Sequence, residues 1–221
     1  MNLPAELFPA WWHGLAWVAV LTVLWWLART APWGRLVAGG HAHRLFGLAV
    51  ALAVLWSMNA GVMPGLNLHL LGAMAATLAL GPQFAMVALG LALAAVTLNG
   101  ALEWSAWAIN FLVMVVVPVC FAHRFRRIIE CALPAHFFVF VFVVAFFGSG
   151  ATVVVEGVTA AAMLVAAGAY PAAFLLSDYL PFFMLLGFAE AWISGAVIAL
   201  LVVYKPEWVE AFDDRRYLLD K

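Results

Sequence analysis

This sequence contains unusually few charged residues. Only 10% of its 221 residues are charged, whereas 68% are hydrophobic. Soluble domains carry about 25% charged residues, and a helix that spans a bilayer needs roughly 20 mostly apolar residues. The composition therefore excludes an ordinary soluble domain and predicts an all-α, polytopic membrane protein surrounded by the lipid bilayer. The net charge of −1 gives no support to a nucleic acid partner.

Several catalytic signatures are also missing. The chain has no G-x-x-x-x-G-K-[ST] nucleotide loop, no G-x-S-x-G element and no H-E-x-x-H helix. We therefore expect no enzyme and no covalently bound cofactor; a membrane redox enzyme is a weaker alternative. The two cysteines, Cys120 and Cys131, are expected to be free core thiols, because the cytoplasmic side is reducing. The first residues lack a basic n-region, so we expect no cleaved signal peptide and expect Met1 to stay on the chain.

The few positive charges are clustered rather than scattered. They occupy three places in the sequence: Arg29, Arg35 and Arg44; Arg124, Arg126 and Arg127; and Lys205, Arg215, Arg216 and Lys221. Loops rich in Lys and Arg stay on the cytoplasmic side of a membrane. The pattern therefore predicts that the N-terminus lies outside and the C-terminus inside.

Apolar runs separated by glycine, proline and charge predict about seven transmembrane helices. Their expected ranges are 11–28, 45–63, 68–80, 84–98, 107–121, 134–169 and 181–204. The range 134–169 is interpreted as one span, because the basic cluster before it and the basic tail must share a side. Two spans divided at 148–150, and totals of six or eight, stay open. We treat 1–221 as one membrane domain with a cytoplasmic tail at 206–221.

Polar side chains at membrane depth are costly and need a reason. The candidates are Asn59, Asn67, His69, Asn110, His136, Glu156, Asp178 and Glu190. His69 is either a nitrogen ligand for a transition metal or an interfacial histidine bonded to a backbone carbonyl. Glu190 either braces helices or contacts a polar solute, and Glu156 is interpreted as a brace or an interfacial group. The asparagines are interpreted as interhelical hydrogen-bonding groups.

Three segments resemble one family of permeases. Residues 68–82, LHLLGAMAATLALGP, resemble a "GHLLGGxLAAxLLGP" segment. Residues 1–11 resemble an "MHIxxGFLPxxW" opening, and residues 187–207 resemble a last helix of the form "GEAxITAxVVxxxxxxRPEL". These are segments of the CbiM/NikM permeases, the substrate-specific components of energy-coupling factor (ECF) transporters for cobalt and nickel.

The resemblance implies where a site lies. Residues 1–10 are expected to fold back toward the membrane core, so that Met1, residue 2 and His69 hold a metal ion that is the transported substrate. Position two is Asn2 instead of the family's histidine, which removes one imidazole. Asn2 leaves open a weaker site, another metal or another small solute.

The resemblance also implies supporting residues and partners. Asn59, Asn67, Asn110 and Glu190 are expected to support the site. The expected partners are a transmembrane coupling protein and ABC-type ATPases on the cytoplasmic face of the cell (inner or plasma) membrane. The alternative is a membrane scaffold or assembly protein that retains the permease fold without the metal site.

Overall fold

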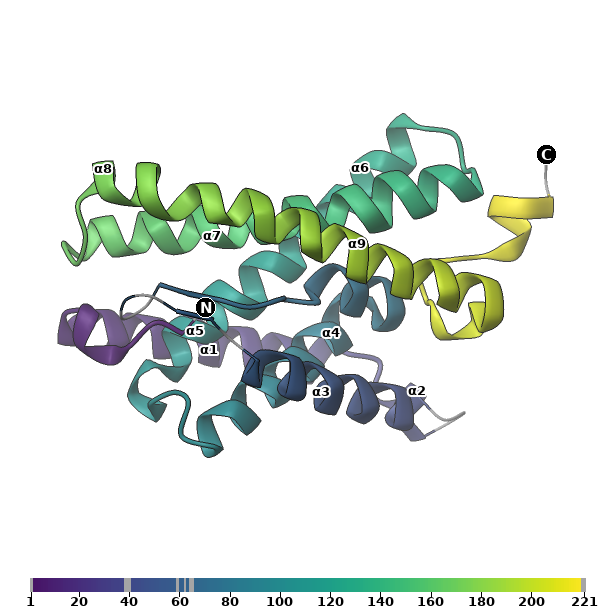
Figure 1. Ribbon diagram of the computed structural model, residues 1–221. Helices are drawn as coiled ribbons and strands as arrows, with labels where there is room; N and C mark the ends of the chain where they lie inside the picture. Colours follow the sequence, from purple (N-terminus) through teal and green to yellow (C-terminus); the bar gives the residue numbers. More distant parts are fainter. Residues whose placement is uncertain (1, 38–40, 59, 62, 64–65, 220–221) are drawn as a thin grey trace.

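Helices make up most of the molecule (Figure 1). The computed structural model of the protein describes residues 2–37, 41–58, 60–61, 63 and 66–219. The first half of the chain contains η1 (Ala5–Leu7), α1 (Ala10–Thr30), α2 (Gly34–Val37), α3 (His41–Ser57), β1 (Ala60–Gly61), β2 (Asn67–Leu68) and α4 (Ala73–Leu98). The second half contains η2 (Trp104–Ala106), α5 (Trp107–Phe111), η3 (Leu112–Val116), α6 (Val117–Ala132), η4 (Val139–Phe147), α7 (Gly148–Ala166), α8 (Ala172–Phe174), η5 (Leu175–Tyr179), α9 (Leu180–Tyr204), η6 (Pro206–Trp208) and η7 (Arg215–Leu219). The all-α class is confirmed.

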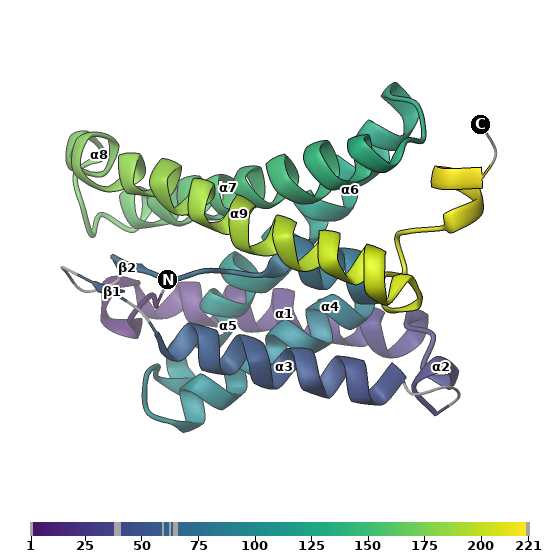
Figure 2. The ribbon, with the colours of Figure 1, turned by 45° about the vertical axis from the view of Figure 1, so that its right-hand side comes forward.

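Two groups of helices lie side by side with α4 between them. In both ribbon views α6, α7 and α9 lie on one side and α1 and α3 on the other (Figures 1 and 2). The central helix α4 packs against α3, α6, α7 and α9. Together with the span 104–132 it is the most buried of the candidate spans, because its side chains are apolar or small nearly all the way round. The core therefore lies along α4.

Several neighbouring elements join into continuous spans. Residues 104–132, 139–166 and 172–204 are each apolar and long enough to cross a membrane, as are α1 and α4. The interpretation of 134–169 as one span is confirmed, since Gly148-Ser149-Gly150 stays helical. Gly150 and Gly187 allow α7 and α9 to approach closely: a Cβ on Gly150 would lie 2.9 Å from the Gly187 carbonyl oxygen.

The chain reverses its direction inside α4. Near Leu71 it lies beside the end of α3, where Trp56 Nε1 donates a hydrogen bond to the Leu71 carbonyl. Further on, Phe84 packs with Leu45 near the start of α3. By Asn99 the chain is back at the end of α3, where both line a shallow groove. The extended segment and the first part of α4 thus make one pass, and the rest of α4 makes another.

Gly81 forms the bend in α4. Its backbone has φ 76° and ψ 165°, a conformation that only glycine adopts readily, and Pro82 follows. The predicted break at Gly81-Pro82 is therefore confirmed. The predicted helix start at 68 was wrong, because residues 67–68 pair with β1 and α4 begins at Ala73. The two parts of α4, counted separately, add to α1, α3 and the spans 104–132, 139–166 and 172–204. The described part of the chain thus passes along the bundle seven times.

Other predicted boundaries were also wrong. α3 begins at His41 and ends at Ser57, because the residues after it enter the hairpin instead of extending the helix. The basic residues at 124–127 lie on α6 rather than in a loop, since this helix continues to Ala132. Its apolar residues Phe125 and Ile129 pack on the core, which leaves the arginines a polar side. Cys120 and Cys131 are free, as predicted, but exposed rather than in the core.

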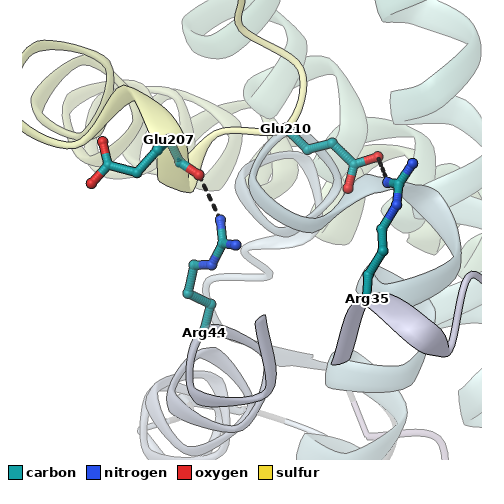
Figure 3. Close-up of polar contacts among 4 residues, drawn as sticks. All are labelled: Arg35, Arg44, Glu207 and Glu210. Atoms are coloured by element: carbon teal, nitrogen blue, oxygen red, sulfur yellow. Dashed lines mark hydrogen bonds and ion pairs between the residues drawn. The ribbon is translucent and has the colours of Figure 1, made fainter. Parts of the chain in front are cut away.

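The C-terminal segment after α9 crosses the ends of several helices. Glu210 and Ala211 donate backbone hydrogen bonds to the carbonyls of Ala79 and Leu78, just before the bend. Figure 3 shows Arg35 paired with Glu210 at 3.3 Å and Arg44 donating to the Glu207 carbonyl at 2.6 Å. Further along, Arg216 lies 3.8 Å from Glu130 on α6. We call residues 206–217 the tail strap; it joins the ends of both helix groups.

Candidate functional site

His69 lies in an extended segment that runs between the two helix groups. This segment follows β2 and leads into α4 in both ribbon views (Figures 1 and 2). The His69 side chain is 4% exposed, and the ring of Trp56 on α3 lies 5.4 Å from it, centroid to centroid. His69 Nδ1 lies 3.0 Å from the Leu70 carbonyl oxygen. A carbonyl can only accept, so Nδ1 carries the proton and Nε2 carries the lone pair of the neutral ring. Nε2 is then the nitrogen suited to a metal ion.

Glu190 on α9 holds the end of this segment. Its Oε2 accepts a hydrogen bond from the Leu71 N–H at 2.8 Å, and its Oε1 accepts one from the Gly72 N–H at 2.7 Å. Ser194, one turn along α9, donates to the same Oε1 at 2.8 Å. A carboxylate at a helix N-terminus also interacts favourably with the helix dipole. Glu190 therefore braces α4 against α9 and positions the backbone two residues after His69.

Gly72 makes that brace possible. It is the N-cap of α4 and has a left-handed conformation, φ 74° and ψ 6°. A Cβ at this position would collide with the Leu52 side chain on α3. The chain can therefore turn from an extended segment into a helix while both N–H groups face Glu190.

The N-terminal segment is held in the same core by Asn110. The Leu3 N–H donates to Asn110 Oδ1 at 2.9 Å, and Asn110 Nδ2 donates to the Leu3 carbonyl at 2.9 Å. Asn110 Nδ2 also donates to Ala106 one turn earlier, at 3.0 Å. Leu3 is fully buried in the same cluster as Trp56 and Leu71. A side-chain amide that both donates and accepts matches one peptide unit, so Asn110 fixes the register of this segment.

The other predicted site residues divide into three cases. Asn2 is buried, with 8% of its surface exposed. Asn67 lies in β2, where its side chain packs against Gly61 across the hairpin instead of reaching into the core. Met1 and Asn59 lie outside the described residues. The structure thus brings Asn2, His69, Asn110 and Glu190 into the interior and leaves Asn67 at its edge.

The sequence analysis did not identify the residue that packs over His69. Trp56 was not singled out, yet it is buried, packs against the imidazole at a tilt of 42° and donates to the Leu71 carbonyl. No motif distinguishes it from the other tryptophans of the chain. Within the part of the chain that the structure describes, no three His, Cys, Asp or Glu side chains gather closely enough to share a metal ion. A site at His69 must therefore draw on other donors.

The comparisons with known proteins decide the family. A family model described as the cobalt uptake substrate-specific transmembrane region (CbiM) matches residues 2–208. The chain belongs to this CbiM family. The resemblance of the three segments is thereby confirmed, and the chain is a multi-pass membrane protein of metal uptake, from a family of transporter components and not of enzymes.

Two solved structures are similar in fold. One, described as a transition metal transporter, superposes with a TM-score of 0.77 at 18% identity and covers 91% of this chain and 92% of its own. The other, a truncated transition metal transporter, has a TM-score of 0.66 at 17% identity and covers 92% of this chain and 99% of its own. No curated protein matches the chain significantly. At these identities the structures show that the CbiM chain shares their fold.

Proposed function

We propose that this CbiM protein is the substrate-binding subunit of an ECF-type ABC transporter that takes up a transition metal ion of the cobalt or nickel kind. The observation that carries the proposal is the buried His69. Its Nδ1–H is committed to a backbone carbonyl, and Glu190 holds the following peptide units. Imidazole nitrogen is a common ligand of such metals, and an oriented ring loses less freedom on binding.

The proposed site combines His69 with the N-terminal segment. Met1 and Asn2 would supply the remaining donors, with Asn110 as the residue that holds the segment in register. An amide side chain is a weaker ligand for Ni²⁺ or Co²⁺ than imidazole. We therefore expect the wild-type site to bind these ions more weakly than a variant with histidine at position two.

The proposed partners follow from the family. Metal uptake against a gradient needs an energy source, and the sequence carries no nucleotide-binding loop. A transmembrane coupling protein and ABC-type ATPases on the cytoplasmic side would supply it. The N-terminus would then face outside, where the ion arrives, and the tail strap would face the cytoplasm.

Metal binding by the purified protein tests the proposal. Equilibrium dialysis against Co²⁺ and Ni²⁺, singly, should give one ion per chain for the wild type. His69→Ala should lose binding, and Asn2→His should tighten it at least tenfold. Ser149→Ala is a matched control, since Ser149 is buried but only donates to the Ala145 carbonyl of its own helix.

The alternative, a scaffold protein that retains the permease fold, is favoured only by Asn2. It predicts that the wild type binds neither ion and that Asn2→His alone creates binding.

The proposed partners have a test of their own. If the protein works in an ECF transporter, it should co-purify with a coupling protein and ATPases that are expressed beside it. Loss of cellular metal uptake on deleting any one of them supports the ECF assignment, and unchanged uptake contradicts it.

A further inference from the structure

Two buried oxygen atoms in the helix group of α6, α7 and α9 have no hydrogen-bond partner among the described residues. They are Glu156 Oε1 on α7 and the Tyr179 hydroxyl at the end of η5. Glu156 is 1% exposed and Tyr179 is 3% exposed. Burying an unpaired polar group costs free energy, and a carboxylate costs most, so such groups are rare without a purpose. Helix bracing does not explain this pair, because neither oxygen forms a hydrogen bond to a neighbouring described helix.

The segments that carry the two groups pack against each other where α7 meets the start of α9. Gly157, which follows Glu156, packs directly on the ring of Phe183. The Phe183 ring in turn contacts the Tyr179 ring edge to face, with 5.1 Å between the centroids. The groups are close enough for the charge of Glu156 to act on Tyr179, and Glu156 also interacts electrostatically with Glu190. Glu156 is therefore coupled electrostatically both to Tyr179 and to the carboxylate that positions the segment after His69.

A cavity borders Tyr179 at the end of the molecule where the hairpin lies. Its volume is about 400 Å³, and it is formed between the β1–β2 hairpin and the helical stretch around Tyr179. Asp178 and Tyr179 line it on one side, and Leu68, the neighbour of His69, lines it on the other. The remaining lining is mostly apolar. One cavity thus borders both Tyr179 and Leu68, which precedes His69 in the same segment.

Charge explains why a cation needs a carboxylate here. His69 is neutral as a ligand, and the Glu190 carboxylate already accepts three hydrogen bonds. A divalent ion that enters an apolar interior with neutral ligands alone leaves its charge uncompensated, which is costly at low dielectric. When it is ionised, Glu156 supplies a buried negative charge with an oxygen not committed to another described residue.

We propose that the Glu156 carboxylate and the Tyr179 hydroxyl form an oxygen-donor station that receives a divalent transition metal ion between the hairpin cavity and His69. Glu156 compensates the charge of the ion, and Tyr179 orients the carboxylate by donating its hydroxyl proton or contacts the ion through its oxygen. The proposal rests on the proposed function and adds two residues and an entry side to it. It also explains how a site with Asn2 in place of an imidazole holds an ion.

Neutralising variants test the station. Glu156→Gln keeps the size of the side chain but removes its charge, and Tyr179→Phe removes only the hydroxyl group. Thr152→Val is the matched control, because Thr152 is buried one turn earlier on α7 and only donates to the Gly148 carbonyl. Co²⁺ and Ni²⁺ affinities are measured by equilibrium dialysis on detergent-purified full-length protein, together with the melting temperature of the metal-free form.

The expected pattern separates a metal role from a structural one. Glu156→Gln should weaken binding at least tenfold while the metal-free protein melts at the same or a higher temperature, because an unpaired buried carboxylate does not stabilise the fold. Tyr179→Phe should weaken binding severalfold, and Thr152→Val should leave it unchanged. Unchanged affinity in Glu156→Gln, or a lower melting temperature with unchanged affinity, overturns the station.

The outcomes keep this inference apart from the proposed function. If the wild type binds and His69→Ala does not, but Glu156→Gln binds as the wild type does, the station is wrong and the His69 site stands. If the wild type binds neither ion, the proposed function is wrong and the station falls with it. Should Glu156→Gln not fold, Tyr179→Phe decides, and an unchanged dissociation constant in that variant overturns the station.

Discussion

At the scale of single residues, the buried polar side chains of this protein form hydrogen bonds with backbone groups as well as with other side chains. Glu190 accepts from two N–H groups at the start of α4, and Asn110 pairs with both polar groups of Leu3. The sequence alone identified Glu190 and Asn110 as buried groups that needed partners. It did not identify the partners, because backbone N–H and carbonyl groups are the same in every residue and carry no sequence signal.

The brace formed by Glu190 should be the most sensitive polar contact of the core. Glu190→Ala leaves two buried N–H groups without their acceptor, which should cost about 3 kcal/mol or more of stability. Ser194→Ala removes one donor and should cost about 1 kcal/mol. Thermal unfolding in detergent measures both, and equal losses in the two variants would show that the carboxylate does not brace α4.

Asn110 should control the N-terminal segment. Asn110→Asp keeps the acceptor for Leu3 but loses the donor to its carbonyl, and it places an acid opposite that carbonyl. Amide hydrogen exchange of residues 2–8 should become at least tenfold faster. Asn99→Asp, at the exposed end of α4, is the control and should leave that exchange unchanged. Unchanged exchange in Asn110→Asp would mean that packing alone holds the segment.

At the scale of elements, α4 shows what a local pattern can and cannot predict. Gly81-Pro82 marked a break, because a proline removes a helical hydrogen bond and glycine allows a positive φ. The start of the helix at Ala73 was not predicted. The leucines at 68, 70 and 71 continue the apolar run of the helix that follows, and the extended form of this segment depends on the β1 pairing and on Glu190. Tertiary contacts overrode the local pattern there.

The bend and the tail strap should depend on each other. A Cβ on Gly81 would lie 3.0 Å from the Glu210 carboxylate and would strain a backbone at φ 76°. Gly81→Ala should therefore lower stability by about 1–3 kcal/mol and loosen the strap. Limited proteolysis at Arg215 and Arg216 should then become faster.

Gly100→Ala is the control for this prediction. Gly100 also has a positive φ, 80°, but a Cβ there meets nothing within 4 Å. It should lower stability by about 1 kcal/mol without changing cleavage of the strap. Equal cleavage in both variants would show that the strap does not depend on the bend.

At the scale of the whole molecule, the charge clusters correctly predicted which helix ends lie together, whereas several single helix boundaries were predicted wrongly. Arg35 and Arg44 contact the tail strap, and Arg216 lies near Glu130 on α6. The three basic regions thus lie at one end of the bundle, as the even number of passes between them requires. The site was less predictable, because Trp56 on α3 and Glu190 on α9 reach the segment that carries His69 only after distant helices pack.

The orientation in the membrane can be tested with single cysteines. Cys120 and Cys131 are exposed, so both are first changed to alanine. Glu103→Cys should then react with a membrane-impermeant maleimide added to intact cells, and Asp213→Cys should react only after lysis. The reverse pattern would place the hairpin cavity on the cytoplasmic side and contradict uptake through it.

The central claim is that His69 binds the transported metal ion, and X-ray absorption at the metal edge tests it most directly. The Co²⁺-loaded wild type should show a shell of nitrogen and oxygen ligands with the multiple scattering of one imidazole. That signature should double in Asn2→His and disappear in His69→Ala, which should also lose most of the bound metal. A wild-type spectrum without imidazole scattering, or one that His69→Ala leaves unchanged, would contradict the account.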